Sequence, residues 1–158
     1  MPSIEKIRVS AKAVIIRDGE LLTTVNHYEG EEPFRLLPGG GQEPGEPLED
    51  AVRRECREEI GCDVSVGELL FVRDYIGSNH RFASRQSHLH QVEIMFSCSL
   101  PTGAEPRLTG EGDDFQTGVA WVPLDRLEEE RFFPRALAPR LRALAAGRKE
   151  PGYLGAVN

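Results

Sequence analysis

Residues 40–62, GGQEPGEPLEDAVRRECREEIGC, decide the fold, because their charges lie where the packing of an ordinary helix would not allow them. The stretch is typical of a loop that runs into a helix. Pro47 suits the first helical position, where a missing N–H costs nothing, and Glu46 and Glu49 place negative charge at the positive end of the helix dipole. Gly61 supplies the stop.

The buried face of this helix is interrupted by acids. At about 100° per residue, its apolar side chains form one stripe, which we expect to be buried. Glu55 and Glu59 project into the middle of that stripe, and Glu58 lies at its flank beside Arg54. Carboxylates one turn apart repel each other, and burying them unpaired costs far more, so we predict a cation among them. The apolar positions are Leu48, Ala51, Val52, Cys56 and Ile60.

Two interpretations of these acids are open. A solvated acidic helix predicts carboxylates opposite the apolar stripe, which fits Glu49 better than it fits Glu55 and Glu59. A cluster of oxygen ligands for a hard divalent ion, Mg²⁺ or Mn²⁺, fits the inward acids, because carboxylates are ligands that such ions prefer. We favour the metal site.

The same stretch resembles the Nudix hydrolase box, G-x5-E-x7-R-E-U-x-E-E-x-G-U, in which U is a bulky apolar residue. Leu37-Pro38-Gly39 looks like the usual lead-in, and Cys56 and Cys62 stand at U positions, where cysteine packs as a small apolar side chain. So many fixed positions make a specific signal. The residues in register are Gly40, Glu46, Arg54, Glu55, Glu58, Glu59 and Gly61.

Strands on both sides of the acidic helix, with a second helix at residues 139–146, predict a mixed β-sheet between helices. The resemblance implies the same α/β/α sandwich, a fold of the α/β (α+β) class. We expect one domain over residues 1–147 and a tail over 148–158 whose low apolar content does not predict order. A further helix should begin near Leu124. The expected strands are 6–17, 20–28, 34–37, 63–75 with a bend, 88–100 and 119–123.

The reaction that the resemblance implies is hydrolysis of a nucleoside diphosphate linked to another group. Water must approach a phosphorus shielded by negative oxygens, and bound metal ions neutralise those oxygens and lower the pKa of bound water. We assign Glu55 and Glu59 as direct metal ligands and Glu58 as a third ligand or the general base. Arg54 would orient Glu58 or Glu46, and Glu46 would clamp the loop to the helix outside the ligand shell.

Other residues are candidates for contact with substrate. The backbone of Gly39, Gly40 and Gly41, expected as a loop, would offer a metal or phosphate contact, and Gly40 is the candidate for the metal. Arg35 stands where many relatives carry tryptophan. Arg81 lies in a basic loop, and Glu93 is a polar residue in a strand otherwise fit for burial. Relatives often place one more acid before a segment like Trp121-Val122-Pro123, and the choice among Glu111, Asp113 and Asp114 is open.

The composition limits the class of substrate and the cellular compartment that we expect. A net charge of −7 argues against a sequence-independent grip on nucleic acid, so we expect a small-molecule nucleotide or nucleoside diphosphate derivative as substrate. No stretch predicts a membrane span or a leader, and the odd count of three separated cysteines suggests neither a zinc site nor a disulfide framework. These features favour the cytoplasm. The resemblance suggests a homodimer, since relatives are often dimers, but no segment identifies an interface.

Two other functions are considered. A Nudix-fold module that senses a nucleotide without cleaving it is disfavoured by the full set of acids. An isomerase acting on a prenyl diphosphate would need an activated cysteine, and Cys56 is in an apolar position with no evident basic partner. The proline and the later tyrosine typical of the ADP-ribose and diadenosine polyphosphate groups are missing, which favours a nucleoside triphosphate or a general nucleotide substrate.

Overall fold

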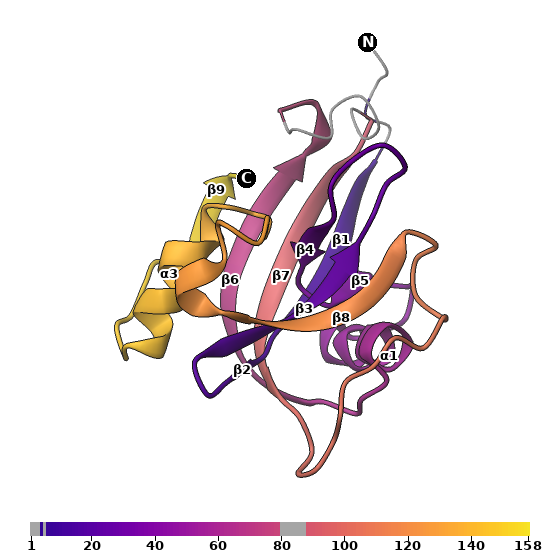
Figure 1. Cartoon of the computed structure of the whole chain (residues 1–158). Coiled ribbons are helices and arrows are strands. Elements are labelled where there is room, and N and C mark those ends of the chain that lie inside the picture. The colour runs from indigo at the N-terminus through magenta and orange to yellow at the C-terminus, as the bar shows by residue number, and fades with distance from the viewer. Residues whose placement is uncertain (1–3, 5, 80–87) are drawn as a thin grey trace.

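The computed structural model describes residue 4, residues 6–79 and residues 88–158 of the chain. Two β-sheets lie at its centre, with a helix at either side (Figure 1). Arg81, a predicted substrate contact, lies outside the described residues.

The larger sheet is mixed. It contains β1 (Ile7–Val14), β5 (Gly39–Gly41), β6 (Ser65–Ile76), β7 (His90–Ser99) and β9 (Tyr153–Ala156), in the order β5-β1-β7-β6-β9. The pairs β1–β7 and β6–β9 are parallel, and the pairs β1–β5 and β6–β7 are antiparallel. The prediction of a mixed sheet is confirmed. The segment 63–75, expected as two strands with a bend, contains instead one strand, β6, which begins at Ser65 and whose pairing with β7 shifts register near Leu69.

The smaller sheet is antiparallel. It contains β2 (Ile16–Arg17), β3 (Glu20–Asn26), β4 (Phe34–Leu36) and β8 (Gln116–Pro123), and β3 pairs with the other three. The single strand expected over residues 6–17 is divided at Ile15, and its two parts enter different sheets. Ile15 is buried with the residues under the acidic helix, and its carbonyl accepts a hydrogen bond from Leu22 N. The chain therefore passes from one sheet to the other at a buried residue.

The acidic helix, α1 (Leu48–Ile60), lies where the sequence predicts it. Pro47 is its N-cap, so the helix begins one residue later than expected, and Gly61 ends it with a left-handed φ of +67°. The helix buries its apolar stripe against the larger sheet, in one cluster with side chains of β1 and β7. The fully buried members from the helix are Ala51, Val52, Cys56 and Ile60.

The second helix, α3 (Leu137–Ala145), packs on the opposite face of the larger sheet. Leu141 shares a cluster with Met95 of β7, whereas Cys56 shares one with Phe96. Because neighbouring residues of a strand face opposite ways, the two helices cover opposite faces. The α/β/α arrangement is confirmed. Residues near Leu124, where a helix was expected to begin, form only the short 3-10 helix η2 (Leu124–Arg126); another, η1 (Gly77–Asn79), follows β6.

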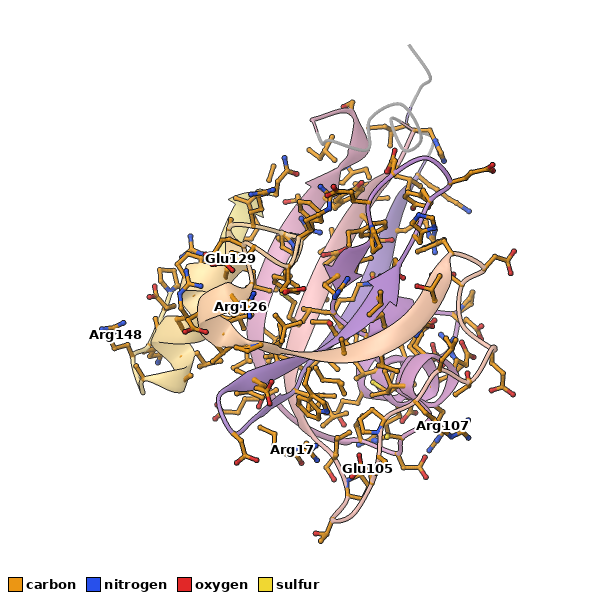
Figure 2. All side chains as sticks on the ribbon, viewed as in Figure 1. Arg17, Glu105, Arg107, Arg126, Glu129 and Arg148 are labelled. Carbon is orange, nitrogen blue, oxygen red and sulfur yellow. The ribbon has the colours of Figure 1, made fainter. Side chains whose placement is uncertain are left out.

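The C-terminal tail differs from the expectation. Residues 148–158 contain β9, which pairs with β6 and buries Leu154 in the core beside α3. A strand at a sheet edge needs few apolar side chains, since its backbone supplies the pairing. Charged side chains such as Arg107, Arg126 and Arg148 lie at the periphery (Figure 2). Among the described residues, none of the helices is long and apolar enough to cross a membrane.

Candidate active site

A cavity of about 550 Å³ lies between the two sheets, within the range of small-molecule sites. Its two sides differ. Side chains of the larger sheet and α1 supply charged groups, including Lys12, Glu55 and Glu93. The other side is aromatic, and its rings contact one another at centroid distances between 5.1 and 6.4 Å. These rings are Tyr28, Phe34, Phe115 and Phe133.

Glu59 is a buried acid of α1, only 6% exposed. Its Oε2 accepts a hydrogen bond from Gly39 N at 3.3 Å, so the acid is fixed against the glycine segment. Burial raises the pKa of Glu59 to about 8, although nearby Lys12 acts in the opposite direction. The carboxylate is therefore held where its negative charge lacks full compensation.

Glu55 lies one turn before Glu59, and its side chain is 15% exposed. Burial raises the pKa of Glu55, and the Arg54 guanidinium opposes this shift without cancelling it. Gly40 permits the approach of this acid: a Cβ on Gly40 would meet the Glu55 carboxyl atoms at 2.6 to 2.8 Å. The absence of a side chain at Gly40 thus makes room for the Glu55 carboxylate.

The glycine segment is a strand, not the loop that we expected. Gly39–Gly41 form β5 and pair antiparallel with Ser10, Ala11 and Lys12. Gly39 has a φ of +141°, and a Cβ there would come within 2.2 Å of Ala11 O. Only glycine therefore allows this close pairing, which holds the segment rigidly against the two acids.

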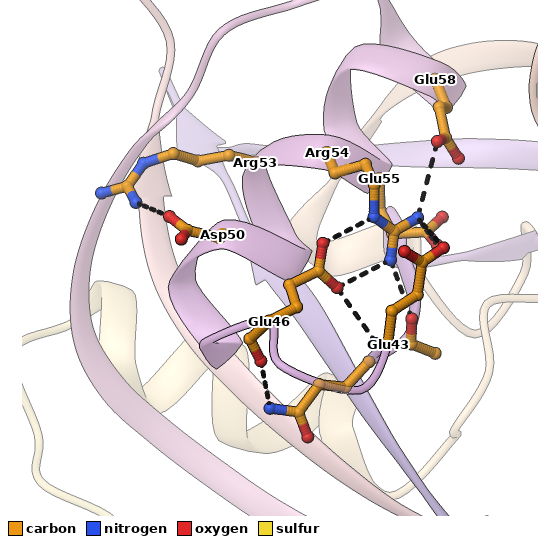
Figure 3. A network of polar contacts seen from close by, with 9 residues as sticks. Glu43, Glu46, Asp50, Arg53, Arg54, Glu55 and Glu58 are labelled. Atoms are coloured by element: carbon orange, nitrogen blue, oxygen red, sulfur yellow. Dashed lines mark hydrogen bonds and ion pairs between the residues drawn. The ribbon is translucent and has the colours of Figure 1, made fainter.

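Arg54 connects the acids of α1 to the segment that precedes the helix (Figure 3). Its Nε and Nη2 donate to Glu46 at 2.8 and 3.0 Å, and Nη2 also donates to Gly41 O at 2.9 Å. Its Nη1 lies 2.9 Å from Glu55 Oε1 and 3.5 Å from Glu58 Oε1. The bond with Arg54 lowers the pKa of Glu46. Arg54 thus orients the acids, and Glu46 clamps the segment to the helix.

The donor set suits a hard divalent cation, though it does not form a finished metal cage. Within residues 4, 6–79 and 88–158, no three His, Cys, Asp or Glu side chains gather as a metal site. Glu58 lies beside Arg54, and Glu59 accepts a hydrogen bond from Gly39 N. The donors are nevertheless oxygens, and two of them have pKa values raised by burial, so a cation would relieve their charge.

Arg35 is separated from this cavity. Phe34 and Leu36 of β4 line it, and since neighbouring residues of a strand face opposite ways, Arg35 points away. Its Nη2 lies 3.4 Å from Glu130 Oε2. The expectation that Arg35 contacts substrate is corrected by this placement.

Among the acids left open, Asp113 lines the cavity and also lies near Glu59, whose pKa it helps to raise. Glu111 lines a separate hollow beside Arg57, and Asp114 is exposed. Glu93 lines the cavity as expected and is 6% exposed.

Sequence reasoning missed two cations. Arg73 Nε donates to Glu93 Oε2 at 2.6 Å, and Lys12 Nζ donates to Gly39 O at 3.3 Å. Burial alone would raise the pKa of Glu93, but Arg73 and Lys12 lower it overall. Each cation interrupts an apolar strand, Lys12 between two alanines and Arg73 after Val72. This interruption was the signal that could have found them.

Comparisons with known proteins agree with this geometry. A family model described as the NUDIX domain matches residues 6–143. The nucleoside triphosphatase NudI of Salmonella arizonae is 38% identical over 106 residues, which cover 66% of this chain and 70% of that protein. The nucleoside triphosphatase NudI of Escherichia coli O1:K1 is 33% identical over 88 residues, which cover 54% of this chain and 59% of that protein. The match therefore spans between 59% and 70% of these curated relatives.

A solved structure shows the same fold. The NUDIX hydrolase from Nitrosomonas europaea superimposes with a TM-score of 0.70 at 21% identity, covering 92% of this chain and 93% of that one. The resemblance noted in residues 40–62 is thus confirmed over most of the sequence. With its family model matched from residue 6 to residue 143, the chain belongs to the Nudix family.

Proposed function

We propose that the protein is a pyrophosphohydrolase that cleaves a phosphoanhydride bond of a nucleoside triphosphate or a related nucleoside diphosphate derivative, with Mg²⁺ or Mn²⁺ as cofactor. The observation that carries the proposal is Glu59, a buried carboxylate that accepts a hydrogen bond from Gly39 N in a small hollow beside the cavity, which Lys12 and Asp113 also line. Family membership and the nucleoside triphosphatase activity for which the NudI relatives are named support the same reaction.

Glu55 and Glu59, with the backbone at Gly40, are the groups that would hold the cation. Bound there, a divalent ion supplies charge neutralisation at the phosphate oxygens and lowers the pKa of the attacking water. Glu58 is the proposed general base, because its side chain is 37% exposed at the rim of the acids, where it can accept a proton from water. Arg54 would keep Glu58 and Glu55 in place.

Lys12 supplies positive charge from the sheet. Its Nζ bonds Gly39 O and acts on the pKa values of Glu55, Glu59 and Glu93, so it lies among the acids. An ammonium group at this place can contact a phosphate oxygen of the substrate. The aromatic side of the cavity would receive the base, since aromatic rings stack on bases of every kind.

The test is incubation with Mg²⁺ and a panel of nucleoside triphosphates and nucleoside diphosphate derivatives, with products identified by mass. Release of pyrophosphate, phosphate or a nucleoside monophosphate, abolished by chelation and restored by metal, is the expected result. Tight binding of a nucleotide with no product would instead identify a sensing module. The expected setting is the cytoplasm, which the three free, buried cysteines favour. A homodimer stays a prediction of the family resemblance.

A further inference from the structure

The cavity side of the larger sheet carries polar residues in rows that cross three strands. One row contains Ser10 of β1, Glu93 of β7 and Arg73 of β6, which are register partners. All three line the cavity. The row lies two residues, roughly 6.6 Å, from Lys12 along β1. A ligand whose phosphates lie beside Lys12 and Glu55 would therefore extend over this row.

Ser10 is the residue in the row that points to a ligand. It is 0% exposed, yet within the described residues its Oγ has no hydrogen-bond partner. A buried hydroxyl without a partner is destabilising, and nearly all such groups in folded proteins are paired. Alanine at this position would avoid that cost. A bound molecule that forms a hydrogen bond with the Ser10 hydroxyl would explain why a serine occupies this position.

Glu93 faces the same space as a fixed acceptor. Arg73 Nε donates to its Oε2 at 2.6 Å, and Gln91 Nε2 donates to its Oε1 at 3.2 Å. Arg73 is itself held, because its Nη1 donates to Val157 O at 2.7 Å beyond β9. An ionised carboxylate only accepts hydrogen bonds, and its two oxygens can each accept more than one. Because the protein donates one hydrogen bond to each oxygen, the Glu93 carboxylate can still accept hydrogen bonds from a ligand.

We propose that Glu93 and Ser10 form a base-recognition subsite that accepts hydrogen bonds from the N1–H and 2-amino groups of a guanine-type base. The proposal rests on the proposed nucleotide hydrolysis and adds its substrate class. Adenine presents an acceptor at N1 and would meet the carboxylate unfavourably, whereas hypoxanthine keeps the N1–H and lacks the amino group. The aromatic rings opposite the row favour a base over the ribose diol, which also carries adjacent donors.

Steady-state kinetics with GTP, ITP, ATP and dGTP in Mg²⁺ test the subsite. For the unchanged protein we expect kcat/KM for GTP to exceed that for ITP by about tenfold or more, since hydrogen bonds to charged groups are strong. Glu93→Gln should reduce this ratio to below about threefold. Equal values for GTP and ITP in the unchanged protein would overturn the proposal. A Glu93-dependent preference for GTP over dGTP, with none over ITP, would overturn it in favour of the ribose.

Ser10→Ala provides a second test that does not depend on the ion pair. We expect KM for GTP to rise about three- to tenfold with kcat unchanged, the loss of one hydrogen bond. The melting temperature should stay the same or rise, because a buried unpaired hydroxyl is removed. Ser97→Ala, in the same sheet and outside the cavity lining, is the matched control. An unchanged KM in Ser10→Ala would contradict the proposal.

Calorimetric binding of guanosine and inosine without metal separates this proposal from the proposed function. Guanosine binding that Glu93→Gln abolishes, in a protein that hydrolyses no nucleotide, would support the subsite and refute the hydrolase. Hydrolysis with no guanosine preference would refute only the subsite.

Discussion

Two arginine–carboxylate clusters lie at the same cavity and differ in their charge balance. Arg54 on α1 faces Glu46, Glu55 and Glu58, so negative charge is in excess there. Arg73 on β6 faces Glu93, and Lys12 also acts on this acid, so positive charge is sufficient. Burial raises the pKa of Glu55 in the first cluster, whereas in the second the two cations outweigh burial and lower the pKa of Glu93.

The difference shows what each cluster is suited to bind. Buried charge is tolerated when it is compensated, and the second cluster is compensated by the protein itself. The first cluster, together with Glu59, is not, so a divalent cation would complete it. One end of the cavity thus suits metal and phosphate, and the other offers a fixed, ionised acceptor to the rest of the substrate.

The largest expected effect tests the first cluster. Glu59→Gln keeps the size of the side chain and removes its charge, so metal-dependent hydrolysis should fall by about a thousandfold, a loss of several kcal/mol in the transition state. Initial rates at saturating Mg²⁺ measure it, and circular dichroism checks the fold. Glu49→Gln, in an exposed position on the same helix, is the control and should change the rate less than twofold or so. A rate within tenfold of the unchanged protein would remove Glu59 as a ligand.

Two neighbouring glycines should separate stability from activity. Gly39→Ala places a Cβ against backbone at a positive φ and should lower the free energy of unfolding by about 3 kcal/mol. Gly40→Ala places its Cβ against the flexible end of Glu55, so the protein should stay folded while hydrolysis falls by roughly 30-fold. Urea unfolding and initial rates measure the pair. Equal losses of stability would show that Gly40 serves the backbone rather than Glu55.

The metal-free protein should lose stability as pH rises. The pKa of Glu59 is raised from 4.5 to about 8, so between these values the native state keeps a proton that the unfolded chain releases. The free energy of unfolding should therefore fall by about 3 to 4 kcal/mol from pH 5 to pH 8. Thermal melts in chelator measure the trend, and Glu59→Gln should flatten it. Added Mg²⁺ should restore stability at pH 8. A melting temperature that changes with neither pH nor metal would contradict the claim that the charge of Glu59 is uncompensated.

The smallest effect concerns the clamp. Glu46→Gln weakens the paired bonds from Arg54 without touching the inward acids, so we expect about a tenfold loss in kcat/KM and retained metal dependence. A loss as large as that of Glu59→Gln would mean that Glu46 holds the metal itself. Parallel rates for the two variants decide between these roles.

The features that could be predicted from the sequence are those set by residues close to one another along the chain. The helix, its buried stripe and its inward acids are local, because side chains three and four residues apart share a face. Gly61 and Glu59 are therefore found where periodicity puts them. The cluster at Arg73 unites β1, β6 and β7, and only the parallel register of β1 with β7 brings Ser10 beside Glu93.

Other features that differ from the prediction also depend on how strands pair and which face they bury. Arg35 was expected at the cavity by analogy, but alternation along β4 turns it outward, a matter of which face the strand buries. The strand at residues 153–156 depends on a free edge of β6 that no local pattern reveals. Asp113 is distinguished from Asp114 only by the path of the chain over Glu59.

Metal binding itself tests the account most directly. Titration of the protein with Mn²⁺, followed by electron paramagnetic resonance in the absence of nucleotide, reports the ion without any assumption about substrate. We predict saturable binding by the unchanged protein and loss of that binding in Glu55→Gln/Glu59→Gln, with Glu93→Gln unaffected. Equal Mn²⁺ affinity in the unchanged protein and the double variant would contradict the claim that these inward acids hold a divalent cation.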